Sequence, residues 1–501
     1  MKRFLYHLNL FLSRLVSFFS HSGELHHARF ARVHELSDIL TDSLPTDSLL
    51  LGLNNFSRIL HVKSTQARRE LGNCLVVAPT RGGKGLLAVS QLLTWKHSVI
   101  VNDIKGDLFD QTAGYRRTLG KVYVVDPDGI GNRYDPLLTK RTEKDLLSAA
   151  THLLHRPDEG EGRIFTERAT VMLTQLLLAA REEHAPPFPF VRQMVRLGLQ
   201  GSAKRLFRIS SDLTTQFLEA ELEEANFDDR FLLSSWGTLS VRMRFLLTDS
   251  VVRCLTGTDF TAKDVMCSEK PVTLYLRWPE RDLLMLSPLV RLLWESLVNE
   301  LIHTYDAAKG QSCRPVLLLI DEAGQAPIPN LQQYAATIAG RGISLWIAVQ
   351  ALSQLDGLYG KHKADTIRNN CDSKIFYRQA SLETAEYVER SLGRRSGYAH
   401  SQTLHEGEET SEGLSEHAVP LLTSQDINQL GHDEIIGWHS NRKPFRARRM
   451  DWRGFPILKQ RRAIPPPQLS ALPQIEESLL PSPWGRGERW PLAPIDPDNL
   501  N

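Results

Sequence analysis

The chain has 501 residues, of which 42% are hydrophobic and 24% are charged. A chain of this length is too long to fold around a single hydrophobic core, so we expect more than one domain. The composition is that of a globular protein and excludes a fibrous or wholly disordered chain. Lys and Arg number 60 against 58 for Asp and Glu, so only a local cluster could indicate an anionic partner. The five cysteines are scattered singly, which fits a reducing compartment better than a disulfide framework.

The first predicted element is an amphipathic helix over residues 1–22. Between Phe4 and Phe19 large apolar side chains recur at helical spacing, but polar residues interrupt them. These 16 residues fall short of the roughly 20 apolar residues that a membrane span needs, and no A-x-A cleavage site follows. The helix is either an anchor on an anionic membrane or a partner, or a helix packed on its own domain.

Short apolar segments alternate with helical patterns from about residue 73 onward, which predicts an α/β domain with a mostly parallel sheet. Nearly continuous apolar segments are typical of strands that are buried on both faces. The predicted strands are Cys74–Ala78, Ser98–Asn102, Lys121–Asp126, Val272–Trp278, Val316–Asp321, Ser344–Val349 and Lys374–Arg378. Residues 50–140 and 255–460 are assigned to this domain.

Other patterns fill the remaining segments. Residues 141–254 have helical periodicity throughout, which predicts an all-α domain inserted into the α/β domain. Ser396–Glu416 is polar and rich in Glu, Ser and His, and is predicted to be a mobile loop. Glu434–Ser440 and Phe445–Trp452 alternate like strands around a turn, which predicts a hairpin. The proline-rich tail, 461–501, is expected to be extended or disordered.

A phosphate-binding loop is predicted between the first of these strands and the helix after it. The candidate nucleotide-binding residues are Pro79, Thr80, Arg81, Gly82, Gly83, Lys84, Gly85 and Leu86. Backbone N–H groups at the glycines and at the helix N-terminus would surround the phosphates of ATP, and Lys84 would reach the β- and γ-phosphates. The strict motif fails at Ala78, where Gly is usual, and at Gly85, where a hydroxyl normally holds Mg²⁺. A chance glycine-rich turn is the alternative.

Two carboxylates end a later buried strand, Val316–Asp321. Asp321 is predicted to bind Mg²⁺, directly or through water, and Glu322 to polarise the water that attacks the γ-phosphate. An ordinary solvated strand end is the alternative for this motif alone. The order and context of both motifs favour a nucleotide-binding site.

Further catalytic candidates flank the next strand. Gln350 ends that strand, where its amide could sense the γ-phosphate or orient water, and the alternative is a surface glutamine. Arg341 precedes the strand and is the leading candidate for an arginine that enters the nucleotide site of a neighbouring subunit. Competing candidates are Arg368, Arg378 and the pair Arg394-Arg395.

At these motifs the sequence resembles the type IV coupling proteins of the TraG/TraD group, hexameric ATPases that hand DNA or protein substrates to a secretion channel. The loop at Ala78–Gly85 is similar to that family's phosphate loop, in which glycine often follows the lysine. The resemblance covers most of the chain. Its other segments are Asp103–Asp107, Tyr134–Leu137, Gln350–Leu355, Tyr359-Gly360, Ile367–Asp372, Glu383–Glu386, Pro420–Thr423 and Phe445–Arg449.

The resemblance implies a RecA-like P-loop domain with an inserted all-α domain, and a homohexamer with ATP and Mg²⁺ at the subunit interfaces. It implies a DNA-translocating ATPase whose partners are single- or double-stranded DNA, relaxase or secreted protein substrates, and type IV secretion channel components. The expected location is the cytoplasm, at the inner face of the bacterial cell membrane.

Family members usually begin with two transmembrane helices, whereas about 50 residues precede Leu51 here. We therefore expect one of three arrangements. The N-terminal helix contacts the membrane peripherally, a separate subunit supplies the anchor, or the chain is a soluble motor with another task.

Two functions of other classes stay open, namely an ATP-gated recruitment platform without pumping and a soluble double-stranded DNA translocase unrelated to secretion. The pair Glu322 and Gln350 favours hydrolysis, because a platform needs no group that activates water. Residues 436–463, here called the basic cluster, contain nine Lys or Arg and one acid. This cluster could contact DNA or anionic lipid, or form a solvated hairpin face.

Overall fold

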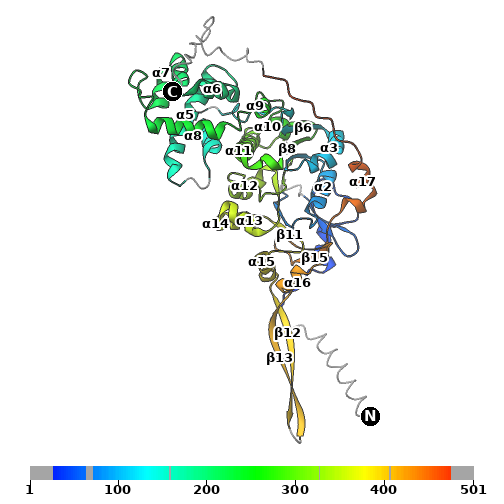
Figure 1. Ribbon diagram of the computed structural model, residues 1–501. Helices are drawn as coiled ribbons and strands as arrows, with labels where there is room; N and C mark the ends of the chain where they lie inside the picture. Colours follow the sequence, from blue (N-terminus) through cyan, green and yellow to red (C-terminus); the bar gives the residue numbers. More distant parts are fainter. Residues whose placement is uncertain are drawn as a thin grey trace.

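The computed structural model describes residues 26–63, 71–140, 142–156, 160–325, 328–405 and 408–475. The amphipathic helix predicted at 1–22 and the tail beyond residue 475 lie outside these ranges. The described residues form an α/β domain with a group of helices at one end and a two-stranded ribbon at the other (Figure 1). Within those ranges, no helix combines the length and apolar character that crossing a bilayer requires.

A 13-stranded sheet forms the centre of the α/β domain, in the spatial order β1-β3-β2-β15-β14-β11-β4-β10-β9-β5-β8-β6-β7. Its parallel strands are β4 (Cys74–Val77), β5 (Ser98–Asp103), β6 (Lys121–Asp126), β8 (Val272–Arg277), β9 (Val316–Ile320), β10 (Ile343–Val349) and β11 (Ser373–Phe376). These are the strands predicted from the sequence. Most of their residues are buried, as strands covered on both faces must be.

Antiparallel strands extend the sheet beyond β11. The predicted hairpin is present as β14 (Glu434–His439) and β15 (Phe445–Arg448), and β14 pairs with β11. The remaining strands of this side are β1 (Leu40–Thr41), β2 (Ser48–Leu53) and β3 (Ile59–Lys63), which follow the 3₁₀ helix η1 (Val33–Ile39). The α/β domain therefore begins before residue 50, its predicted start, because the buried leucines of β2 continue the core. The short strand β7 (Ile130–Gly131) closes the opposite edge.

Helices cover both faces of the sheet and bury two hydrophobic clusters (Figure 1). One face carries α2 (Lys84–Thr94), α3 (Asp107–Leu119) and α17 (Pro456–Arg462). The other carries α11 (Leu283–Ala307), α12 (Leu331–Thr337), α13 (Leu352–Tyr359) and α14 (Lys361–Asn369). The remaining helices of this domain are α10 (Ala262–Cys267), α15 (Leu382–Leu392) and α16 (Ser424–Asn428).

The segment between β7 and α10 folds into helices. They are α4 (Glu143–Leu154), α5 (Arg163–Glu182), α6 (Pro187–Ile209), α7 (Ser211–Leu218), α8 (Arg230–Met243) and α9 (Asp249–Cys254). Helix α5 is central and contacts α4, α6, α7 and α8. No strand occurs among the described residues of 141–254, where the sequence predicts helices only.

A long β-hairpin occupies the segment that was predicted to be a mobile loop, so that prediction is wrong. Strands β12 (Arg394–His405) and β13 (Glu408–Pro420) pair with each other and project away from the α/β domain, opposite the all-α helices (Figure 1). None of the ribbon side chains that the structure describes is buried. Strand residues that are not buried need no apolar alternation, so the polar sequence gave no strand signal.

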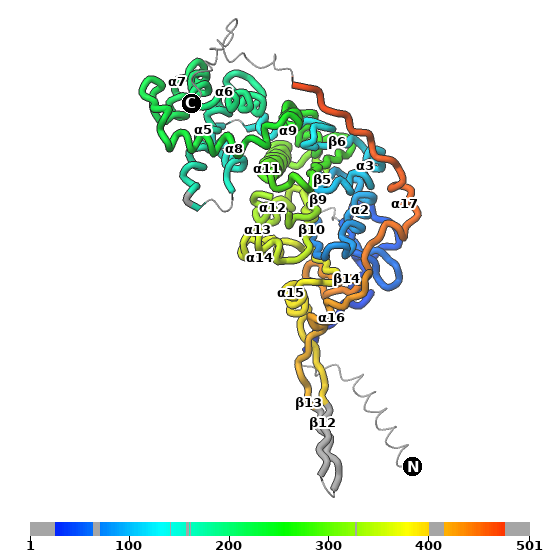
Figure 2. Tube along the Cα trace, in the orientation of Figure 1, coloured from blue at the N-terminus to red at the C-terminus, as the bar shows by residue number. Residues whose placement is uncertain are grey.

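The first part of the predicted tail is extended and lies on the domain surface (Figure 2). The N–H of Gly131 donates to the carbonyl of Ser470 at 2.9 Å, and the N–H of Leu472 donates to the carbonyl of Gly129 at 2.8 Å. Leu472 is buried. Of the two predicted states, extended or disordered, residues 465–475 are therefore extended and bound, whereas the first residues of the predicted tail, 461 and 462, end α17.

Candidate nucleotide-binding site

The carboxyl ends of the parallel strands meet at one edge of the sheet, where open α/β folds bind ligands. The phosphate loop follows β4, Asp321 and Glu322 follow β9, and Gln350 follows β10. Because β10 pairs with both β4 and β9, these segments are brought side by side.

The phosphate loop has the backbone of an anion-binding turn. Arg81 has a φ of 63° and Gly83 a φ of 110°, both in the left-handed region. Gly83 is the N-cap of α2, so the N–H groups of Lys84 and Gly85 have no carbonyl partner within the helix, whereas that of Leu86 donates to the carbonyl of Gly83 at 3.1 Å. A β-carbon built on Gly83 would lie 2.8 Å from Nη1 of Arg449 and 3.4 Å from Cε1 of Tyr377. Position 83 therefore requires glycine, and the helix N-terminus can face a phosphate.

Lys84, Glu322, Gln350 and Thr80 form one connected set of hydrogen bonds. The Lys84 ammonium donates to Oε1 of Glu322. Nε2 of Gln350 donates to Oε2 of Glu322 at 3.0 Å, and the Thr80 hydroxyl donates to Oε1 of Gln350 at 3.0 Å. The structure thus brings the predicted residues of both motifs and of β10 together, and Gln350 is not a solvated surface residue.

Glu322 adopts an uncommon backbone conformation. Its φ is 55°, in the left-handed region that non-glycine residues rarely occupy. Such strain persists where the surrounding structure imposes it, and it is frequent at functional sites. Here it turns the Glu322 carboxylate from the end of β9 toward the phosphate loop, where Lys84 binds it.

Asp321 has an atom suited to a metal. Its Oδ1 is buried and has no hydrogen-bond partner among the described residues. Burial raises the pKa of Asp321 to about 6; the Lys84 ammonium lowers it and the Glu322 carboxylate raises it. No group of three or more metal-ligating side chains occurs in the described part of the chain. Mg²⁺ would therefore share Asp321 with phosphate oxygens and water, which is the kind of ligand set that it prefers.

Space for such water lies beside Gly85. A cavity of about 100 Å³ is lined by Gly85, Asp103, Asp321 and Glu322, among others. A β-carbon built on Gly85 meets no atom within 4 Å. The hydroxyl that Gly85 lacks could therefore be replaced by water.

Asp103 ends β5 and begins the next helix. It accepts a hydrogen bond from the N–H of Phe109 at 2.7 Å and a weaker one from Leu108 at 3.4 Å. Burial raises the pKa of Asp103 to about 7, while these bonds lower it and the Asp321 carboxylate raises it. Asp103 thereby fixes the start of α3 beside the site.

Arg341 is not part of this site within the subunit. It precedes β10, so it lies at the opposite edge of the sheet from the phosphate loop. Its Nε and Nη2 atoms bind the Asp306 carboxylate at 2.9 and 3.0 Å, which lowers the pKa of Asp306. Its role in a neighbouring subunit stays a prediction. Among its competitors, Arg368 pairs with Asp356 and Asp365, whereas Arg378, Arg394 and Arg395 are exposed.

Arg449 reaches the phosphate loop and was not among the predicted site residues. It follows β15 directly and lies against Gly83. The sequence analysis places Arg449 in the basic cluster and in the resembling segment Phe445–Arg449, without a role at the nucleotide. The signal that could have found it is its position after a strand, which it shares with Asp321 and Gln350.

Most of the basic cluster is bound within the subunit. Its ion pairs are Arg442–Asp38, Lys443–Glu35, Arg446–Glu434 and Arg453–Asp451. Arg461 donates to the carbonyl of Leu93 at 2.7 Å and lies over the Tyr115 ring. Cations that are already paired add little to phosphate binding, so the structure favours a structured hairpin face over a DNA contact here.

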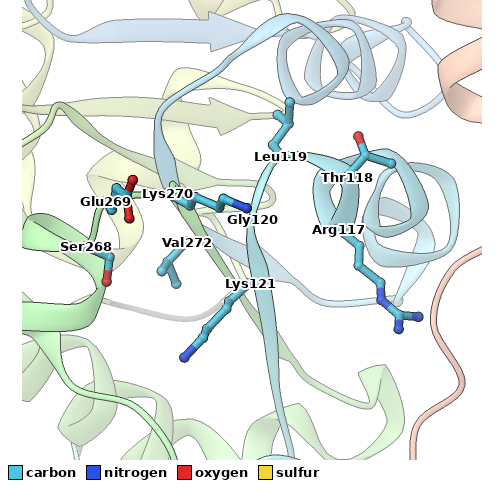
Figure 3. Close-up of a pocket in the computed structure, with 9 residues that line it drawn as sticks. All are labelled: Arg117, Thr118, Leu119, Gly120, Lys121, Ser268, Glu269, Lys270 and Val272. Carbon is cyan, nitrogen blue, oxygen red and sulfur yellow. The ribbon is translucent and has the colours of Figure 1, made fainter.

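A larger cavity, of about 470 Å³, lies at the opposite edge, where β6 and β8 begin (Figure 3). It contains none of the predicted site residues. Arg117, Lys121 and Lys270 line it but do not converge on one point (Figure 3). The geometry of the loop, and not cavity size, therefore locates the candidate site.

A family model described as type IV secretory system, conjugative DNA transfer, matches residues 57–470. Protein VirD4 of Agrobacterium fabrum is 26% identical over 432 residues, covering 82% of this chain and 63% of the relative. Protein VirD4 of Rhizobium radiobacter is 26% identical over 412 residues, with 78% and 58% covered. Conjugal transfer protein TraG of Escherichia coli is 28% identical over 353 residues, with 64% and 54% covered. The chain spans less than two thirds of the length of these relatives.

Solved structures of a conjugative coupling protein share the fold. TrwBdeltaN70 matches with a TM-score of 0.61 and 16% identity, over 85% of this chain and 95% of that one. TrwB in complex with ADP and Mg²⁺ matches with a TM-score of 0.60 and 15% identity, over 90% and 96%. These matches confirm the predicted RecA-like P-loop fold and the resemblance to coupling proteins. By its sequence from residue 57 to 470, the chain belongs to the type IV secretory system conjugative DNA transfer family.

Proposed function

We propose that this chain is an ATP-driven coupling protein that recruits DNA or a nucleoprotein and feeds it to a type IV secretion or conjugation channel. The observation that carries the proposal is the hydrogen-bonded set of Lys84, Glu322 and Gln350 at the carboxyl edge of the sheet. A glutamate held beside the phosphate-binding lysine serves hydrolysis, which a static platform does not need.

In the proposed reaction Lys84 exchanges partners. A γ-phosphate within reach of Lys84 would compete with Glu322 for the same ammonium. Glu322, released from Lys84 and still bound by Gln350, would then accept a hydrogen bond from the attacking water and polarise it. Asp321 would hold Mg²⁺, which when bound neutralises charge on the phosphate oxygens. Thr80 would keep Gln350 oriented throughout.

The proposed assembly is a homohexamer with ATP between subunits. Arg341 would act across that interface, and the all-α helices would receive relaxase or secreted protein substrates. DNA would be held through its backbone phosphates, because a translocating motor cannot depend on base sequence. The ring would work in the cytoplasm at the inner membrane face, next to the channel components. Residues 1–22 would supply a peripheral membrane contact.

The deciding experiment measures the ATPase rate of the purified protein alone, with single-stranded DNA and with duplex DNA. Lys84→Ala and Glu322→Gln are the controls. We expect DNA to stimulate turnover and both substitutions to abolish it. Unchanged rates in both variants, together with no response to DNA, would refute the motor.

The same assay separates the other functions. Nucleotide binding without hydrolysis indicates a recruitment platform. Stimulation by duplex DNA, without delivery of a substrate to a secretion channel in cells, indicates a translocase unrelated to secretion. Flotation with anionic vesicles, with and without residues 1–20, tests the membrane contact, which is withdrawn if the deletion shifts nothing.

A further inference from the structure

We propose that Arg449 binds a phosphate group of the nucleotide held in its own subunit. The proposal rests on the proposed function only as far as nucleotide binding, and not on DNA transport. With this role for Arg449, the β14–β15 hairpin becomes part of the nucleotide site. This hairpin contains the last two strands of the chain.

The direction of β15 brings Arg449 to the phosphate loop. Strand β11 runs parallel to β4. Strand β14 is antiparallel to β11, and β15 is antiparallel to β14. Two reversals restore the original direction, so β15 ends at the same edge of the sheet as β4. Arg449 follows the end of β15 as the phosphate loop follows β4.

The side chain of Arg449 then crosses to the loop. Its Nη1 and Cδ lie 2.8 and 3.2 Å from the position that a β-carbon of Gly83 would take. Its backbone N–H donates to the carbonyl of Asp433 at 2.6 Å, which fixes the start of the side chain. The guanidinium is therefore held next to the N-cap of α2, the end of the helix that favours an anion.

The Asp451 carboxylate lies within electrostatic reach of Arg449: burial raises its pKa, while Arg453 and, more weakly, Arg449 lower it. Asp451 forms its ion pair with Arg453, as Glu434 does with Arg446. No ion pair of Arg449 occurs among the described residues. A half-buried guanidinium beside a phosphate loop is suited to bidentate or charge-assisted bonds with phosphate oxygens.

A purely structural role would look different. Arg449 packs near the buried ring of Tyr377, and such packing needs the length of the side chain but not its charge. Methionine preserves much of that length without charge, whereas lysine preserves the charge. Comparing these two substitutions therefore separates phosphate binding from packing.

The test measures the dissociation constant of ADP with Mg²⁺ by calorimetry, for the full chain and for Arg449→Met, Arg449→Lys and the control Arg446→Met. We expect Arg449→Met to weaken ADP binding about tenfold or more, as the loss of a charge-assisted bond does. Arg449→Lys should recover most of this loss. Arg446→Met should bind ADP like the unchanged protein, since Arg446 points to Glu434.

Three results would overturn the proposal. They are unchanged ADP binding in Arg449→Met, equal losses in the methionine and lysine variants, and no ADP binding by the unchanged protein. Should Arg449→Met not fold, Arg449→Gln replaces it as the uncharged variant, and unchanged ADP binding by Arg449→Gln would likewise overturn the proposal. ADP binding without DNA-stimulated hydrolysis would refute the proposed transport and leave the role of Arg449 standing.

Discussion

Nε2 of Gln350 lies 3.0 Å from Oε2 of Glu322 and donates a hydrogen bond to it. Because this bond orients the carboxylate that would polarise water, we expect Gln350→Ala to lower kcat for ATP hydrolysis by roughly ten- to a hundredfold. The KM for ATP should change little, since Lys84 and the backbone of the loop are untouched and only the Thr80 hydroxyl loses a partner. Steady-state kinetics check this, with Gln333→Ala, an exposed residue of α12, as the control. An unchanged kcat would show that Gln350 has no part in turnover.

Gly85 has room for the hydroxyl that it lacks. A β-carbon there meets no atom within 4 Å, and the adjoining cavity also reaches Asp321. We expect Gly85→Ser to fold normally and to reach half-maximal ATPase activity at a lower Mg²⁺ concentration, because the serine oxygen adds a ligand. The opposing variant is Gly83→Ala, which should lose ADP binding since position 83 has a φ of 110° and contacts Arg449. A Gly85→Ser protein with an unaltered Mg²⁺ requirement would contradict the assignment of this space to metal-bound water.

Asp135 makes stability depend on pH. Burial raises its pKa to about 7; the N–H of Leu137 lowers it and the Glu300 carboxylate raises it. Below about pH 4 both the folded and unfolded chains hold the proton, so nothing is lost. As the pH rises from about 4 to 7, the unfolded chain releases the proton more readily, and the free energy of unfolding falls.

The substitution Asp135→Asn should prevent this fall in the free energy of unfolding at higher pH. Asparagine cannot ionise but can still accept from the N–H of Leu137, a bond of 2.9 Å in this structure. We expect the variant to unfold at higher denaturant concentration than the unchanged protein at pH 8 and at a similar concentration at pH 4. Asp228→Asn, on an exposed side chain, is the matched control. An equal gain at both pH values would mean that charge is not the cause.

The β12–β13 ribbon should be dispensable for folding. Replacing residues 398–416 by Asn-Gly would leave the Gly397–His417 pair joined by a two-residue hairpin turn. Because no described side chain of the ribbon is buried, we expect the thermal unfolding midpoint to change by no more than about 2 °C. Differential scanning calorimetry checks it. A fall of many degrees would show that the ribbon supports the α/β domain in a way that its exposure conceals.

The strands of the sheet centre were predictable, and the ribbon was not. Segments such as Val316–Ile320 are continuous apolar runs because helices cover both faces, and this leaves a plain signal. The side chains of the ribbon β12–β13 that the structure describes are not buried, so strand pairing there leaves no apolar pattern in the sequence. The order of the strands in the sheet could not be predicted either, because no local sequence pattern indicates that β10 lies between β4 and β9.

Some residues of the candidate site could likewise be predicted from the sequence, and others could not. Asp321, Glu322 and Gln350 could be named because each follows a buried strand, and strand ends are visible in the sequence. Arg449 could not be tied to Gly83, because their contact depends on β14 and β11 lying between β15 and β4. The sequence also gave no sign that acidic residues pair with the cations of the basic cluster. Arg442, for example, binds Asp38, which lies 404 positions away in the chain.

The extended segment 465–475 runs along the domain surface between two distant parts of the molecule (Figure 2). At one end Arg461 fastens α17 to the carbonyl of Leu93 in α2, the helix that begins at the phosphate loop. At the other end Nη1 of Arg253, in α9, donates to the carbonyl of Leu472 at 3.0 Å. An extended chain can lengthen only a little. A movement of α9 away from the sheet would therefore strain the bond between Arg253 and Leu472, and through α17 it would act on the helix that follows the phosphate loop.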